Sequence, residues 1–133
     1  MDFVRFLRPA AAGAILFLAI GASAPQRTPL TALGTIERGQ WQLKDVGGTV
    51  RKLCLGNPAA LLQLRHPGQG CKQVVIENTS STATVTYDCP GHGNGRTSVT
   101  VETARLIRVE TSGIVDGMPF AGDYEGRKVG TCS

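Results

Sequence analysis

The stretch that decides the fold is residues 82–89, Thr-Ala-Thr-Val-Thr-Tyr-Asp-Cys. Its apolar and aromatic side chains fall at every second position (Ala83, Val85, Tyr87) and polar side chains occupy the positions between them. This alternation places the apolar side chains on one face of a β-strand and the polar ones on the other. We therefore expect a strand of an antiparallel sheet that has one covered and one solvated face.

Similar patterns on both sides of this stretch predict further strands. They cover residues 40–45, 50–55 and 73–77 before it, and 96–103, 105–111 and 119–131 after it. Segments rich in glycine and polar residues separate them. Hairpin turns are indicated by Val46-Gly47-Gly48-Thr49 and by Asn94-Gly95, and we expect a loop over 112–118, built around Asp116-Gly117. The sequence therefore predicts a mainly β protein, an antiparallel meander that forms a curved sheet or a small barrel.

One segment between Cys54 and Cys71 has a different pattern. Asn57 is a good helix N-cap and Pro58 suits the first helical position. Residues 59–64 are mostly helix formers, and Arg65 and His66 are cations suited to a helix C-terminus. We expect one short helix here, covering the sheet with its leucines.

The N-terminus has the three parts of a secretory signal peptide. Arg5 and Arg8 precede an apolar run that is too short for a comfortable membrane span, and small residues follow at 21–24. We expect a signal peptide over 1–24, cleaved somewhere within 21–24, a loose arm over 25–36 and a β domain over 37–133. This predicts a periplasmic or secreted protein with no stable membrane span after cleavage.

Four cysteines, Cys54, Cys71, Cys89 and Cys132, all follow the signal segment. An even number in a small exported domain indicates disulfides, and four allow three connectivities. We favour Cys54–Cys71, which closes a short excursion, and Cys89–Cys132, because each of these two shares a strand face with an aromatic residue. The wide cysteine spacing is unlike that of a zinc site, so no metal site is predicted.

The charge pattern and the loops offer few candidate sites. The 133 residues carry a net charge of +4, but the cations are scattered, so nucleic acid is not an expected partner. The loop over 89–96 is the most distinctive feature: His92, Asn94 and Arg96 could bind an anionic ligand, or the glycines could simply form a long turn. We predict no catalytic, cofactor-binding or metal-binding residue.

Several short motifs together resemble a known family. They are Gly39-Gln40-Trp41, Cys54-Leu55, Cys71, Tyr87-Asp88-Cys89 and the closing Arg127-Lys128-Val129-Gly130-Thr131-Cys132. In this order they resemble the domain-of-unknown-function 3617 family of small exported bacterial β proteins, which implies a periplasmic setting and no known enzyme activity. Tyr87-Asp88-Cys89 with Gly91 is also similar to part of a motif in periplasmic C-type lysozyme inhibitors, whose inhibitory loop would fall near Ser112-Gly113.

These observations lead to three hypotheses about function. The first is a non-enzymatic exported binding or structural module of unknown ligand, without a cofactor. The second is an inhibitor of a C-type lysozyme, or a binder of another envelope protein. The third is a binder of a lipid or other apolar ligand, which predicts a cavity lined by valine, leucine and isoleucine.

Overall fold

We analysed a computed structural model of the chain, which describes Gly13, Gly21 and residues 29–133. The predicted signal peptide and its cleavage point lie outside these residues, apart from the two single glycines.

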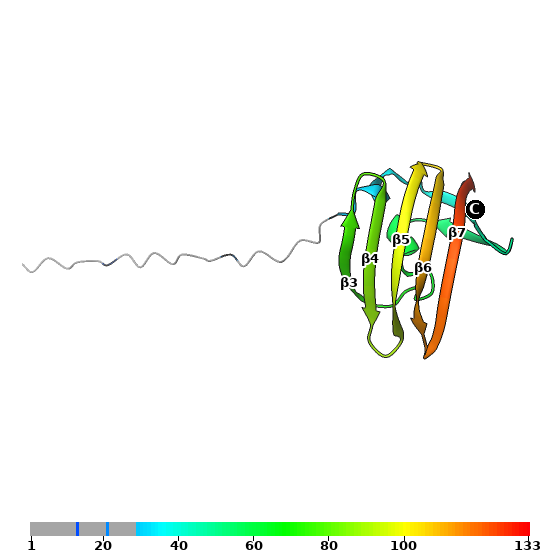
Figure 1. Ribbon diagram of the computed structural model, residues 1–133. Coiled ribbons are helices and arrows are strands. Elements are labelled where there is room, and N and C mark those ends of the chain that lie inside the picture. Colours follow the sequence, from blue (N-terminus) through cyan, green and yellow to red (C-terminus); the bar gives the residue numbers. More distant parts are fainter. Residues whose placement is uncertain (1–12, 14–20, 22–28) are drawn as a thin grey trace, which may run out of the picture.

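The protein is built on one antiparallel sheet of seven strands (Figure 1). The strands are β1 (Gly39–Asp45), β2 (Val50–Leu55), β3 (Lys72–Asn78), β4 (Thr82–Cys89), β5 (Gly93–Thr103), β6 (Leu106–Val115) and β7 (Met118–Gly130). Their order in the sheet is β2-β1-β7-β6-β5-β4-β3. The predicted mainly β fold is confirmed, and the sheet is open, with β2 and β3 as its two edges.

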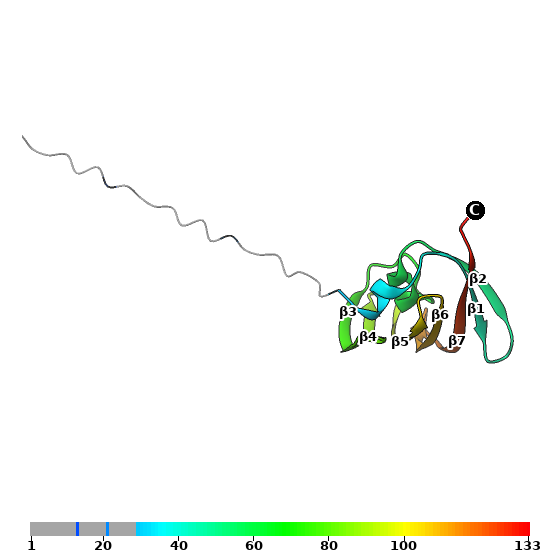
Figure 2. The same ribbon diagram turned by 90° about the horizontal axis from the view of Figure 1, so that it is seen from above.

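The chain forms this sheet in two parts. β1 and β2 form a hairpin at one edge, the chain then crosses to the opposite edge, and β3 to β7 return as a meander until β7 pairs with β1. The crossing carries a 3-10 helix, η2 (Pro58–Gln63), and a second 3-10 helix, η1 (Ala32–Thr35), precedes β1. Both helices cover the same face, around which the sheet curves (Figure 2).

The core lies between this face and the two helices. The sheet contributes Trp41, Leu43, Val85, Val99 and Val109, and the helices contribute Leu33, Leu61 and Leu62. The predicted alternation in β4 is confirmed, since Ala83, Val85, Tyr87 and Cys89 are all buried. Burying apolar surface in this way is the main source of stability for such a domain.

The helix predicted between Cys54 and Cys71 is present, but it is a 3-10 helix. Its N-cap is the predicted residue: Asn57 Oδ1 accepts a hydrogen bond from the Ala59 backbone N at 3.0 Å. The segment has only six residues, and 3-10 geometry is common in such short pieces.

The prediction of a loose arm through residue 36 is wrong for its described part. Ala32, Leu33 and Ile36 are buried in the core and Leu30 packs against it. The missed signal is the run of apolar residues Leu30, Leu33 and Ile36, of which Leu33 lies in η1 and the other two flank it.

The predicted disulfide pairing is also wrong. The bonds are Cys54–Cys132 and Cys71–Cys89, with Cα–Cα distances of 5.6 and 4.3 Å. Cys89 ends β4 and Cys132 follows β7, so β5 and β6 lie between their strands. Three strand spacings amount to roughly 14 Å, far beyond the reach of a disulfide. The pairing was predicted because Cys89 and Cys132 each share a strand face with an aromatic residue. That observation does not show which strands are neighbours in the sheet.

The two predicted turns at 90–95 and 112–118 are shorter than expected. β5 begins at Gly93, so Asn94-Gly95 belongs to a strand, and β6 continues to Val115 through the expected loop. Gly95 is required because a Cβ there would overlap the Tyr87 hydroxyl, which lies against it. The hairpin turns are at Pro90–His92, where Gly91 has φ 78°, and at Asp116-Gly117, the centre of the loop expected over 112–118.

Candidate functional site

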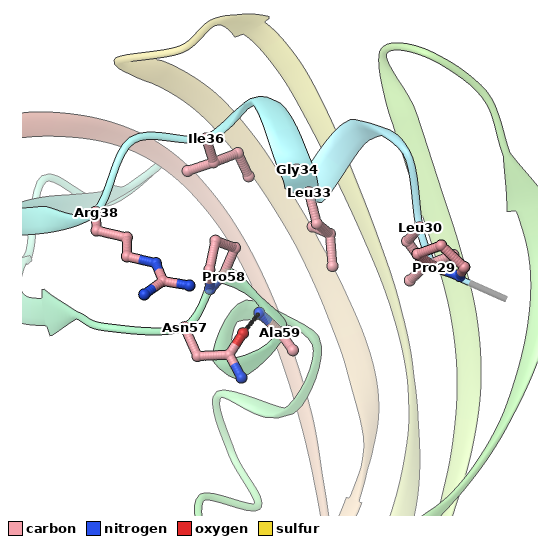
Figure 3. Close-up of a pocket in the computed structure, with 9 residues that line it drawn as sticks. All are labelled: Pro29, Leu30, Leu33, Gly34, Ile36, Arg38, Asn57, Pro58 and Ala59. Carbon is pink, nitrogen blue, oxygen red and sulfur yellow. Dashed lines mark hydrogen bonds between the residues drawn. The ribbon is translucent and has the colours of Figure 1, made fainter. Parts of the chain in front are cut away.

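An open groove of about 400 Å³ lies where the N-terminal segment passes the start of η2 (Figure 3). Its lining comprises Pro29, Leu30, Leu33, Gly34, Ile36, Arg38, Asn57, Pro58 and Ala59. Most of these side chains are apolar. The groove is thus a concave apolar surface of a size typical of small-ligand sites.

The two 3-10 segments position this lining. Leu33 lies in η1, and Leu30 and Ile36 lie on either side of it. All three pack against the core and form the floor of the groove. On the other side, the Asn57 cap fixes the start of η2 and places Pro58 and Ala59 at the rim (Figure 3). Asn57 uses its side-chain oxygen for this cap, which leaves its amide NH₂ as a possible donor to a ligand.

Arg38 supplies the positive charge of the groove. Its side chain is drawn extending towards Pro58 and Asn57 (Figure 3). The neighbouring Glu37 carboxylate lies 3.3 Å from Arg105 and 4.0 Å from Lys128 instead, and Arg38 forms no ion pair within residues 29–133. The groove therefore combines an apolar floor with a guanidinium that can pair with an external anion.

The three residues of the predicted binding loop do not form one site. His92 is in the turn before β5, where its Nδ1 lies 3.6 Å from Asp116 Oδ1. Asn94 and Arg96 are on β5, on the sheet face opposite the helices. Arg96 lines a polar hollow of about 460 Å³, which it shares with Ser98, Glu110 and Asp123.

Neither this hollow nor the rest of the described chain offers a metal site. The hollow mixes acidic, basic and hydroxyl side chains without an apolar floor. Among the described residues, no three His, Cys, Asp or Glu side chains come close enough together to hold a metal ion. The same residues include no helix that is long and apolar enough to span a membrane.

His66, which we expected only to complete a helix end, is buried and joins η2 to the sheet. Its Nδ1 lies 2.9 Å from the Tyr87 hydroxyl and its Nε2 lies 3.0 Å from the His92 backbone oxygen. A carbonyl can only accept, so Nε2 carries a proton. In the neutral ring Nδ1 is then an acceptor, and Tyr87 donates its hydroxyl proton to it.

A hydroxyl pair beside this contact also holds η2. Thr97 Oγ1 donates to the Leu62 backbone oxygen at 2.9 Å and lies 2.8 Å from Thr111 Oγ1. Because a hydroxyl has only one proton, Thr111 must be the donor in the second bond. These bonds hold η2 and the residues after it against the sheet, and thereby position the rim of the groove.

Because the buried Tyr87 ionises at high pH, we expect the protein to lose stability in alkaline solution. Burial raises the pKa of Tyr87, and the nearby charge of Arg65 opposes this rise. A pKa raised in the folded state stabilises the protein at pH values below the unfolded pKa of about 10, and the contribution is lost as pH rises through the folded pKa. We expect urea denaturation to show this decline, and Tyr87→Phe to flatten it. An equal decline in the variant would contradict the assignment.

Comparison with known proteins gives no match: none of the family models, the curated proteins or the solved structures matches this chain.

Proposed function

We propose that this protein is an exported, non-enzymatic binding module that holds an amphipathic ligand with an anionic head group in the groove beside η2. The observation that supports this proposal is the combination of the apolar floor, formed by Leu30, Leu33 and Ile36, with the guanidinium of Arg38, which has no ion-pair partner among residues 29–133. This is a refined form of the lipid-binder hypothesis, with one cation added to the apolar lining.

Export is part of the proposal. The two disulfides are typical of an oxidising compartment, and no free cysteine is found in the protein. The predicted signal peptide and the resemblance to a family of small exported proteins favour the periplasm, or secretion from the cell.

The groove favours a small ligand with an extended apolar chain. Leu33 and Ile36 are themselves almost fully buried, so the ligand would contact the edges of their side chains and lie partly in solvent. Such partial burial yields low energy per ligand atom, and we expect a dissociation constant on the order of 100 µM. Dodecanoate, an apolar chain with one carboxylate, is a suitable probe.

The lysozyme-inhibitor hypothesis has less structural support. The loop that it requires near Ser112-Gly113 is absent at that position, because both residues lie within β6 and pair with β5 and β7. The groove is therefore the better basis for a proposed function.

Replacing Arg38 tests the proposed site. We expect Arg38→Gln to weaken dodecanoate binding about five- to tenfold, because an exposed charge-assisted hydrogen bond is lost while the apolar floor remains. Isothermal titration calorimetry would measure the change. Binding of dodecanol, which has the same chain without the charge, should be unaffected by the substitution.

Arg51→Gln is the matched control. Arg51 is also an exposed arginine, but it lies on β2 and does not line the groove. Equal weakening by the two variants would point to non-specific attraction by net charge. If the unmodified protein did not bind dodecanoate at ligand concentrations up to about 1 mM, the proposed function would be contradicted, because the expected dissociation constant is well below that concentration.

A further inference from the structure

The edge strand β3 is the most exposed part of the sheet. All seven of its residues are exposed, and three consecutive branched apolar side chains, Val74, Val75 and Ile76, have exposed fractions of 62%, 47% and 49%. On its far side no strand of residues 29–133 pairs with it. An exposed apolar edge with unpaired backbone groups is a template for the addition of another strand.

The opposite edge, β2, is protected and provides a comparison. Arg51 and Lys52 lie next to each other within it, and charged residues within an edge strand disfavour pairing with another strand. The disulfide from Cys54 also attaches the C-terminal residues to this edge. In β3 the two charged residues, Lys72 and Glu77, flank the apolar run and leave its centre uncharged.

A bulge makes the β3 edge complementary to itself. The register with β4 pairs Lys72 with Asp88, Val74 with Thr86, and Glu77 with Thr84, and the extra residue is Ile76. Directly opposed residues share a face, so Lys72, Val74 and Glu77 all lie on the face opposite the helices. Without the bulge, Lys72 and Glu77 would lie on opposite faces, because side chains alternate along a strand.

A two-fold axis through Val74 then places opposite charges against each other at both ends of the pair. In an antiparallel pair of β3 strands, Val74 faces Val74 of the second copy, and Gln73 faces Val75. Lys72 faces Glu77 at both ends of the pair, and neither residue forms an ion pair within the described chain. Within residues 29–36, the hydrogen bonds to this strand are at its end, where the Thr31 backbone N donates to Asn78 Oδ1 at 3.0 Å and Asn78 Nδ2 donates to the Pro29 backbone oxygen at 3.4 Å.

From this self-complementarity we infer that the protein forms a symmetric dimer by antiparallel pairing of β3 with β3 of a second copy. The interface continues the sheet from one protomer into the other. The apolar run at its centre does not line the groove, although Asn78 at the end of β3 donates to the backbone oxygen of Pro29, which does. The inference does not depend on the proposed ligand. One added strand pair buries little surface, so the dimer is weak, with a dissociation constant on the order of 100 µM.

Sedimentation equilibrium of the oxidised protein tests this inference. We expect a monomer–dimer equilibrium, and Val74→Lys should raise the dissociation constant at least about tenfold, because it places two ammonium groups opposite each other at the axis. Val50→Lys is the matched control, since Val50 is an exposed valine (45%) on the other edge. It should leave the dimer unchanged.

A charge exchange tests the register without touching the apolar run. Lys72→Glu and Glu77→Lys should each weaken the dimer, because each places like charges opposite one another. The double variant should restore it. A monomer at all concentrations up to about 1 mM would overturn the inference. So would a dimer that Val50→Lys weakens and Val74→Lys does not.

Discussion

Removal of the Cys54–Cys132 disulfide, by replacing both residues with alanine, is expected to lower the free energy of unfolding by about 4.5 kcal/mol. The bridge joins residues 78 apart in the sequence, and in the chain-entropy model a closed loop of this length contributes about 4.5 kcal/mol. Both cysteines are exposed, so little packing is lost with them. Urea denaturation followed by the fluorescence of Trp41, the single tryptophan, would measure the loss.

The same variant also tests the pairing. If Cys54 pairs with Cys132, the double variant keeps the Cys71–Cys89 bond and contains no free thiol. Cys54→Ala with Cys71→Ala serves as the matched control, because it removes one partner from each bond and should leave two thiols. The reverse result in a thiol titration of the denatured proteins would show that the pairing is wrong.

Replacement of His66 by alanine is expected to lower the free energy of unfolding by about 3 kcal/mol. The change opens a cavity under η2 and leaves the Tyr87 hydroxyl and the His92 carbonyl without their partner. Large-to-small changes and unsatisfied buried polar groups each cost a few kcal/mol in similar sites. Urea denaturation would again give the value.

The second histidine of the chain provides the control for this change. His92 is exposed, and its side chain is paired only with the exposed Asp116. His92→Ala should therefore alter stability by less than about 0.5 kcal/mol, as is usual for surface substitutions. If the two variants lost the same stability, the contacts of His66 would not have the importance that we give them.

The strands were predictable because their side-chain pattern is local. The strands at 50–55 and 82–89 have the predicted bounds, the one at 40–45 differs by one residue at its start, and the one at 73–77 differs by one residue at each end. The alternation of β4 identified its buried face because this face is set by the period of the strand alone. The cap at Asn57 was predictable for the same reason, since it depends on three neighbouring residues.

The disulfides could not be predicted in this way because they depend on strand order. The crossing between β2 and β3 places Cys54 and Cys71 at opposite edges of the sheet, although they are close in sequence. The closing pair of β1 with β7 then brings the C-terminal cysteine to Cys54. No local pattern in the sequence indicates that the chain crosses the sheet between β2 and β3.

The groove was missed for a related reason. Each lining segment looks ordinary alone, and the site exists only because η1 and η2 lie side by side on one sheet face. The run of apolar residues Leu30, Leu33 and Ile36 was a usable signal for the first segment. The glycines of the predicted binding loop were misleading, because Gly95 serves the packing of Tyr87.

The most direct test of the proposed function is an NMR titration of the isotopically labelled, oxidised protein with dodecanoate. We expect saturable shifts confined to the groove, at the backbone amides of Leu33, Gly34, Arg38 and Ala59, with a dissociation constant on the order of 100 µM. Shifts centred on the polar hollow at Ser98, Glu110 and Asp123, or no saturable shift up to about 1 mM dodecanoate, would contradict the proposal.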